Sequence, residues 1–374
     1  MKEVLLTTLF SGFNYGSSLQ TFATKTIIEE LGFSCKLVSR KSLIRGRDVR
    51  FGKLLTILFR TVFTLDTKTI DAYRKSFSKK MIGDSESRFQ KFEETYLSPT
   101  QLSWQGLRHY SSECTACIAG SDQIWDSTSL YVDPIYYLRF APPYKRISFC
   151  TSFGHNYVSS YNLDKIKKWI SQFECISVRE ESGVKLIKDL CNREAVYLLD
   201  PTLLIKGEYW RDRFGIRKHT TRYILAYFLD PPSNRARKYI DRAKRELGCE
   251  VVGIPYQHTD MSYVDKIVAT GPIDFLELVD NAEVVITDSF HGTAFSINLH
   301  TPFFVFNRNN GAVHTQNERI FSILNCFKLE RRFEPNDDEF LKKIDFNQTD
   351  IVLDHEINKA KKYLLSSLEK CLTK

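Results

Sequence analysis

Residues 284–293 read Val284-Val285-Ile286-Thr287-Asp288-Ser289-Phe290-His291-Gly292-Thr293. A short apolar run ends in polar residues and a glycine, and an apolar segment follows over 294–299. This pattern predicts a buried strand over 283–287 and a helix from about Gly292, which together form a unit of a parallel α/β sheet. The unpaired N–H groups at such a helix start favour an anion site that contains His291. A histidine that only caps its own helix explains the local pattern equally well.

Short apolar runs alternate with helix-length segments along most of the 374 residues, which is typical of α/β proteins with parallel sheets. The predicted strands are 4–9, 33–38, 115–119, 146–151, 175–178, 196–199, 223–229, 250–254, 283–287 and 303–306. Residues 40–110 break the rhythm and predict a helical insertion. We expect two α/β halves that face a cleft, an N-terminal domain over 1–200 and a C-terminal domain over 201–345. A C-terminal segment, 346–374, follows, and its apolar spacing predicts a long helix over 356–371.

Composition narrows the class of protein. Hydrophobic residues make up 43% and charged residues 26%, which is ordinary for a globular chain. No apolar run reaches the roughly 18 residues of a membrane span, and the start at Met1 does not read as a secretory signal. We therefore expect a cytoplasmic protein with reduced cysteines. Cys114 and Cys117 form a C-x-x-C, which we interpret as a buried strand rather than a metal or redox site.

The positive charge is concentrated in one segment. The chain has 53 Lys and Arg against 45 Asp and Glu, a net charge of +8. Residues 36–80 hold thirteen Lys and Arg against three Asp, around the apolar stretch 54–63. This pattern predicts a peripheral contact with anionic membrane at the inner face of the plasma membrane. A solvated helical hairpin that packs on its own domain is the alternative, and no nucleic-acid partner is expected because no recognition motif accompanies the charge.

Polar clusters follow four other predicted elements. They contain Asn14 and Gly16 (segment 13–20), Gly120 and Asp122 (120–125), His155 (152–156) and Arg179 (177–182). In open α/β sheets, ligands bind beyond the carboxyl ends of the strands, so these clusters predict one site. Each cluster alone is also explained by turn glycines, helix caps and surface charges. The absence of G-x-G-x-x-G, P-loop and G-x-S-x-G motifs argues against dinucleotide, P-loop and serine-hydrolase functions.

Together with Asp200-Pro201-Thr202 and segment 287–292, these clusters resemble the polysaccharide pyruvyl transferase family across residues 4 to about 306. The resemblance implies two Rossmann-like domains in a GT-B-like arrangement, with the acceptor on the N-terminal side and the donor on the C-terminal side. It implies transfer of enolpyruvyl from phosphoenolpyruvate to two hydroxyls of a sugar, giving a pyruvate ketal and phosphate. The acceptor would be a capsule polysaccharide or exopolysaccharide, or its polyprenyl-phosphate-linked oligosaccharide precursor. Neither a cofactor nor a metal is expected.

The resemblance also implies roles for residues. His291 would protonate carbon 3 of the enol, and Arg179 with the Gly292 turn would hold the anionic donor. His155 would orient the donor or relay a proton. Substrate contacts are expected from the residues at the predicted strand ends: Asn14, Gly16, Gly120, Asp122, Asp288, Ser289 and Gly292.

One position departs from the family pattern. Many members carry an arginine two residues before the motif histidine, where this chain has Ser289. We hypothesise that Arg308 or Arg319 replaces that guanidinium. A GT-B-type glycosyltransferase that uses a nucleotide sugar is the alternative enzyme, and a sugar-binding accessory protein that has lost the chemistry is the alternative without catalysis.

Overall fold

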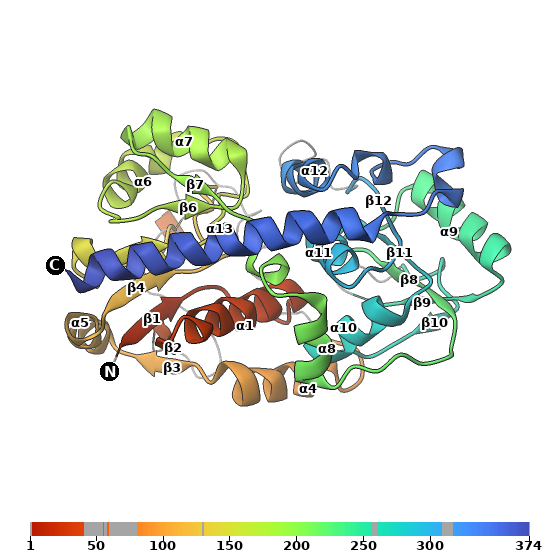
Figure 1. The fold of residues 1–374 in the computed structure, drawn as a ribbon, viewed down its shortest axis with the longest axis horizontal. Coiled ribbons are helices and arrows are strands. Elements are labelled where there is room, and N and C mark those ends of the chain that lie inside the picture. The colour runs from red at the N-terminus through yellow and green to blue at the C-terminus, as the bar shows by residue number, and fades with distance from the viewer. Residues whose placement is uncertain are drawn as a thin grey trace.

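Two five-stranded parallel sheets form the frame of the molecule (Figure 1). The computed structural model describes residues 2–40, 55, 58–59, 81–128, 131–255, 260–308 and 317–373. The first sheet has the order β3-β2-β1-β4-β5, with β1 Glu3–Thr7, β2 Ser34–Arg40, β3 Thr100–Leu102, β4 Ala116–Ala119 and β5 Arg146–Ser148. The second has the order β10-β9-β8-β11-β12, with β8 Tyr223–Tyr227, β9 Glu250–Gly253, β10 Lys266–Ile267, β11 Val284–Thr287 and β12 Phe303–Val305.

Both sheets have the strand order of a Rossmann fold. In each, the chain forms the central strand first, then the strands toward one edge, and then returns to form the strands on the other side of the central strand. A short parallel pair, β6 (Ser177–Val178) and β7 (Val196–Tyr197), continues the first sheet through isolated bridges from β5. The predicted α/β fold with two Rossmann-like halves is therefore confirmed. The domain boundaries at 200 and 345 stay predictions.

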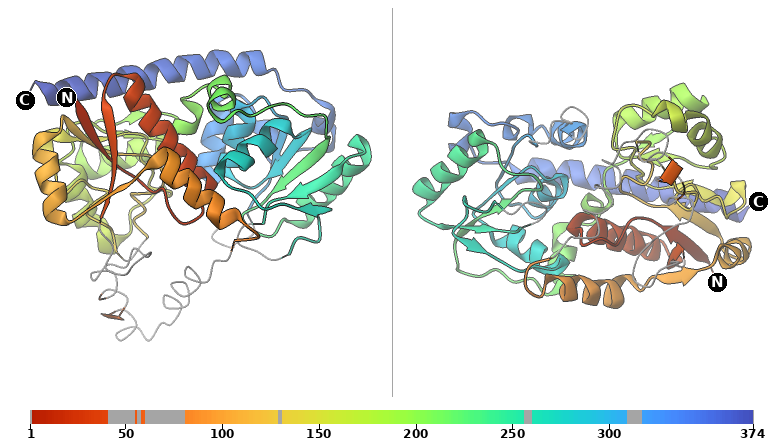
Figure 2. Two further views of the ribbon diagram at one scale, coloured as in Figure 1. Left: turned by 90° about the horizontal axis from the view of Figure 1, so that it is seen from below. Right: turned by 180° about the vertical axis from the view of Figure 1, so that it is seen from behind.

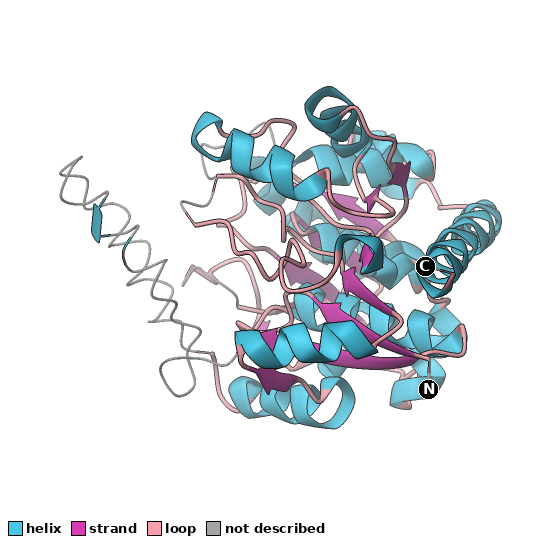
Figure 3. Ribbon diagram, turned by 90° about the vertical axis from the view of Figure 1, so that its left-hand side faces the viewer, coloured by secondary structure: helices cyan, strands magenta, loops and turns pink. Residues whose placement is uncertain are grey.

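Helices cover the sheets on either side, and the strands lie inside (Figure 3). In the first half they are α1 Tyr15–Glu30, α4 Ser85–Phe92, α5 Trp104–Glu113, α6 Leu163–Ile170 and α7 Glu181–Cys191. The second half has α8 Gly207–Phe214, α9 Asn234–Leu247, α10 Pro272–Asn281, α11 Phe290–Asn298 and α12 Asn317–Cys326. Every residue of β4, β8 and β11 is buried, as continuous apolar runs in a doubly covered parallel sheet require.

The structure corrects three sequence-based predictions. The insertion predicted over 40–110 extends too far, since β3 pairs with β2 and α5 then leads back to the central β4. The helix predicted from Gly292 begins two residues earlier, so His291 lies in its first turn rather than before it. The last helix, α13, runs over Phe346–Leu372 and begins well before the predicted 356.

The two halves share one core. Tyr15 at the start of α1 stacks on Phe275 of α10, with ring centroids 4.9 Å apart, and its hydroxyl lies 2.6 Å from Thr270 Oγ1. The helix α13 passes along both halves (Figures 1 and 2) and returns to the first, where Tyr363 Oη donates to the Ser148 carbonyl at 3.0 Å. These contacts tie the sheets together and bring their strand ends face to face.

Most of the basic segment 36–80 lies outside the described residues, so the predicted membrane contact and its hairpin alternative are both untested. None of the helices in the described part of the chain combines the length and apolar character needed to cross a bilayer.

Candidate active site

Two helices from opposite halves begin at the same place. Asn14 caps α1 by accepting the Ser17 N–H at 3.1 Å, and Ser289 caps α11 by accepting the Gly292 N–H at 3.3 Å. Gly16, in the first turn of α1, lies against the imidazole of His291, and a methyl group on Gly16 would come within 1.9 Å of His291 Nδ1. This close approach requires glycine at position 16 and joins two sequence motifs from different halves.

His291 occupies a largely buried position. Its side chain is 12% exposed, and its Nε2 lies 3.9 Å from Asp200 Oδ2 without a hydrogen bond to any described residue. Burial lowers the His291 pKa to about 4; Asp200 and Asp122 oppose this shift, and Arg179 adds to it. The imidazole is therefore neutral at pH 7, and an anion bound beside it would favour its protonated form.

Arg179 is held by carboxylates on three sides. Its Nη1 donates to Asp200 Oδ2, its Nη2 lies 3.4 Å from Asp122 Oδ1, and its Nε lies 3.7 Å from Glu180 Oε1. Ser121 Oγ donates to the same Asp200 oxygen at 3.1 Å. Burial would raise the pKa of Asp122 and Asp200, but the Arg179 guanidinium, and then His291, hold both values below the usual range. These carboxylates orient Arg179 and offset its charge.

The strand ends explain why these residues meet. Asp122 follows β4, Arg179 follows β6 and Asp200 follows β7, and the Arg179 N–H donates to Thr151 O beyond β5 at 3.0 Å. Parallel strands end at one edge, as the sequence analysis expected. Asp122 has a φ of 76° and is bound through Oδ2 by Ser17 Oγ at 2.5 Å, which links the turn to α1.

Arg319 of α12 is a buried cation that forms no ion pair with the described residues. Its side chain is 7% exposed, and it makes no hydrogen bond or ion pair with a described residue. The guanidinium lies over one aromatic ring, that of Phe290, at 5.6 Å, and Arg179 lies over the same ring at 5.2 Å. Burial lowers the Arg319 pKa to about 9, and Arg179 and Arg308 add to the shift, so the group remains charged at pH 7. A buried unpaired cation beside His291 indicates an anion site.

Other predicted site residues take supporting positions. Asp288 accepts the N–H groups of Leu229 and Asp230 at 2.7 and 3.1 Å, and burial raises its pKa to about 6. Arg308 Nε donates to the Asp288 carbonyl at 3.3 Å. These contacts join the ends of β8, β11 and β12.

Two predicted glycines, Gly120 and Gly292, lie very close to neighbouring side chains. A methyl group on Gly120 would come within 3.0 Å of Leu6 and Thr8, and one on Gly292 within 2.8 Å of Thr287 Oγ1. His155 Nε2 lies 3.7 Å from Asp126 Oδ1, and its ring contacts that of Tyr157. Its role toward the donor stays a prediction.

Four residues of this cluster are not predicted as site residues by the sequence: Asp200, Glu180, Ser17 and Ser121. Asp200 belongs to the motif Asp200-Pro201-Thr202, and Glu180 follows Arg179 directly. Their neighbours along the chain gave no sign of a role, since the contacts to Arg179 come from separate strand ends. Cys114 and Cys117 are buried as predicted, with their sulfurs 3.6 Å apart.

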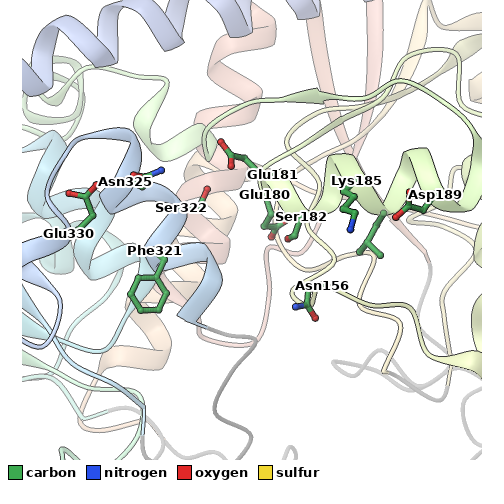
Figure 4. Close-up of a pocket in the computed structure, with 11 residues that line it drawn as sticks. Asn156, Glu180, Glu181, Ser182, Lys185, Asp189, Phe321, Ser322, Asn325 and Glu330 are labelled. Carbon is green, nitrogen blue, oxygen red and sulfur yellow. The ribbon is translucent and has the colours of Figure 1, made fainter.

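A cavity of about 660 Å³ lies beside this cluster, between α7 and α12 (Figure 4). Glu180 is one of its lining residues, and Phe321 and Asn325 of α12 line the opposite side. The cavity therefore has walls from both halves of the molecule.

A sequence model of the polysaccharide pyruvyl transferase family matches residues 14–310. No curated protein matches the chain in sequence. Similar solved structures include UDP-GlcNAc 2-epimerase from Neisseria meningitidis bound to UDP-GlcNAc (10% identity, 96% of this chain and 100% of that chain, TM-score 0.45). Another is the N-terminal domain of trehalose-6-phosphate phosphatase from Candida albicans (9% identity, 100% of this chain and 97% of that chain, TM-score 0.46). A third is the glycosyltransferase SnogD from Streptomyces nogalater (10% identity, 100% of this chain and 98% of that chain, TM-score 0.39).

Proposed function

Because the chain belongs to the polysaccharide pyruvyl transferase family, we propose that it transfers the enolpyruvyl group of phosphoenolpyruvate to two hydroxyls of a sugar. The acceptor is a sugar of a cell-surface polysaccharide or of its lipid-linked precursor. The products are a cyclic pyruvate ketal and phosphate.

The observation that carries this proposal is the buried Arg319 near His291, which pairs with none of the described residues. Phosphoenolpyruvate has a carboxylate and a phosphate, and either would offset the charge of a guanidinium that has no counter-ion. Arg319 reaches the ring of Phe290, the residue between Ser289 and His291. A guanidinium supplied by α12 thus replaces the one that other family members carry at position 289, and we assign it to the donor carboxylate.

His291 then acts as the general acid. The pKa of His291 is low before the donor binds. The negative charge of the donor raises that pKa, so His291 takes up a proton when the donor binds. This is the proton that the reaction uses. Transfer of this proton to carbon 3 creates an electron-poor carbon 2, which a sugar hydroxyl attacks. Arg179, held by its carboxylates, and the N–H groups at the starts of α1 and α11 stabilise the leaving phosphate.

The test is transfer of labelled pyruvate. Phosphoenolpyruvate labelled in its pyruvyl carbons is incubated with methyl pyranosides that carry free 4- and 6-hydroxyls, and label in the glycoside and free phosphate are measured. We expect one phosphate per ketal, with a loss on the order of 10²–10⁴-fold in His291→Gln. Turnover of a UDP-sugar without transfer from phosphoenolpyruvate would indicate a glycosyltransferase instead. Sugar binding with no turnover of either donor would indicate an accessory protein.

A further inference from the structure

The cavity between α7 and α12 has an acidic lining. Among the described residues that line it, four carboxylates, from Glu180, Glu181, Asp189 and Glu330, oppose the cation of Lys185 (Figure 4). An anionic ligand such as phosphoenolpyruvate or a nucleotide would be repelled here. A neutral ligand rich in hydroxyl groups would instead find acceptors for its O–H donors. The charge of the lining thus separates this cavity from the cationic site around Arg319.

Phe321 provides an apolar surface within the same lining. Its side chain is 45% exposed, although the ring packs on Phe333 with centroids 4.4 Å apart. One part of the ring is therefore supported while another faces the cavity. The C–H face of a pyranose ring can cover such a surface and remove it from water. Carboxylates around an aromatic ring suit a sugar better than a wholly polar or wholly apolar ligand.

Glu180 connects the cavity to the cationic site. It is 5% exposed, and its Oε1 accepts from Ser152 Oγ and faces Arg179 Nε at 3.7 Å. Its Oε2 is buried and has no hydrogen-bond partner among the described residues, although Glu180 lines the cavity. Burial raises the Glu180 pKa, which makes the carboxylate a stronger base. Because Glu180 lines the cavity, its carboxylate can accept a proton from a ligand bound there.

We propose that the cavity between α7 and α12 binds the neutral acceptor sugar, and that Glu180 removes the proton from the hydroxyl that attacks the donor. This inference rests on the proposed function and adds the acceptor site and the base. Arg179 lies between the two sites, since it contacts Glu180 through Nε and Asp200 beside His291 through Nη1.

Glu180 and His291 together account for every proton that moves in the reaction. Glu180 takes the proton of the first hydroxyl as its oxygen bonds to carbon 2, and the electron pair of the double bond forms a C–H bond with the proton of His291. The carbon–oxygen bond to phosphate then breaks, and the phosphate leaves with the electron pair and receives the proton held by Glu180. The second hydroxyl bonds to carbon 2, and its proton returns to His291.

Glu180→Gln tests the base. We expect phosphoenolpyruvate to bind within about threefold of wild type by calorimetry, and the rate of transfer to methyl pyranosides to fall on the order of 10²–10⁴-fold. Formate should restore part of the activity of Glu180→Ala, because a small carboxylate can replace the missing base, whereas it would not repair a structural defect. Glu194→Gln is the matched control on an exposed glutamate outside the cavity and should behave as wild type.

Phe321→Ala tests the sugar site at a side chain that is 45% exposed. We expect the Michaelis constant for methyl pyranosides to rise on the order of tenfold, with that for phosphoenolpyruvate unchanged, and we expect no change in Ile351→Ala, which truncates an exposed side chain of α13.

The outcomes separate the two levels of proposal. Full transfer activity in Glu180→Gln, or unchanged acceptor kinetics in Phe321→Ala, would overturn the inference and leave the proposed function standing. Loss of phosphoenolpyruvate binding in Glu180→Gln would also overturn it, because Glu180 would then belong to the donor site. Wild-type protein that transfers to no pyranoside would remove the proposed function together with the inference.

Discussion

Arg319 carries an unfavourable free energy until it is paired. Burial of a charged group without a counter-ion costs several kcal/mol, and a cation–π contact such as that with Phe290 returns at most about 2 kcal/mol. After burial, Arg179 and Arg308 contribute most to lowering the Arg319 pKa, and Glu180 and Asp122 oppose them only in part. Binding of an anion relieves the repulsion between these arginines, and the relief contributes to the affinity of the cationic cluster for a negatively charged donor.

Gly16 sets the position of His291. In Gly16→Ala, the added methyl group would come within 1.9 Å of the imidazole, so the ring or the start of α1 must shift. A displacement of about 1 Å at a catalytic group can reduce kcat on the order of 10²-fold, and we expect a loss of that size in pyruvyl transfer. Steady-state kinetics and thermal unfolding of the same sample separate lost catalysis from lost folding.

Gly106→Ala is the control for this substitution. Gly106 lies in α5, where a methyl group would meet its nearest neighbour, Ser103 Oγ, at 3.4 Å. We expect unchanged kcat and a free energy of unfolding that is equal or up to about 1 kcal/mol higher, as alanine favours a helix. Wild-type kcat in Gly16→Ala would show that His291 does not depend on this contact.

At the scale of elements, the start of α11 explains the departure at Ser289. The hydroxyl caps the helix by accepting the Gly292 N–H, and the side chain is buried. In Ser289→Ala we expect the free energy of unfolding to fall by about 1 kcal/mol, with phosphoenolpyruvate affinity changed less than about threefold. Chemical denaturation and calorimetry measure the two quantities.

Ser289→Asp distinguishes a cap from a ligand. Aspartate caps helices as well as serine does, so stability should stay near wild type, but its charge should weaken phosphoenolpyruvate binding about tenfold or more. If Ser289→Ala instead weakens donor binding as much as Ser289→Asp does, the hydroxyl itself contacts the donor.

Sequence periodicity predicted the buried strands because each is a continuous apolar run between helix-length segments. It missed β3 and β10, since Thr100–Leu102 and Lys266–Ile267 are short edge strands without such a run. It did not predict the helix α12 around Arg319, although Ile320, Ile323 and Leu324 of that helix are buried in the shared core. Pairing at a sheet edge and packing of one short helix depend on distant residues, which local patterns do not contain.

At the scale of the whole molecule, the candidate site exists only because two Rossmann-like halves meet. The first half supplies Arg179, Glu180, Asp122 and Asp200, and the second supplies His291 and Arg319. The sequence predicted that residues at the strand ends would meet. Which of these residues form ion pairs depends on how the two halves pack. The overall charge of +8 does not describe this site, where a few buried groups carry the recognition.

The central claim is that phosphoenolpyruvate binds between His291 and Arg319. Arg319→Ala should weaken that binding by at least about tenfold, because the variant loses a charge-assisted contact in a buried site. Arg331→Ala, on an exposed side chain of the same half, is the control and should bind as wild type.

The most direct test is calorimetric titration with phosphoenolpyruvate near pH 7, in two buffers of different ionisation enthalpy, for wild type, His291→Gln and Arg319→Ala. Before the donor binds, His291 is neutral at pH 7, because its pKa is about 4. A bound anion raises that pKa, so wild type should take up a proton on binding, whereas His291→Gln should not. The affinity of wild type should therefore fall relative to that of His291→Gln as pH rises. Equal proton uptake in both proteins, with undiminished affinity in Arg319→Ala, would contradict donor binding at this site.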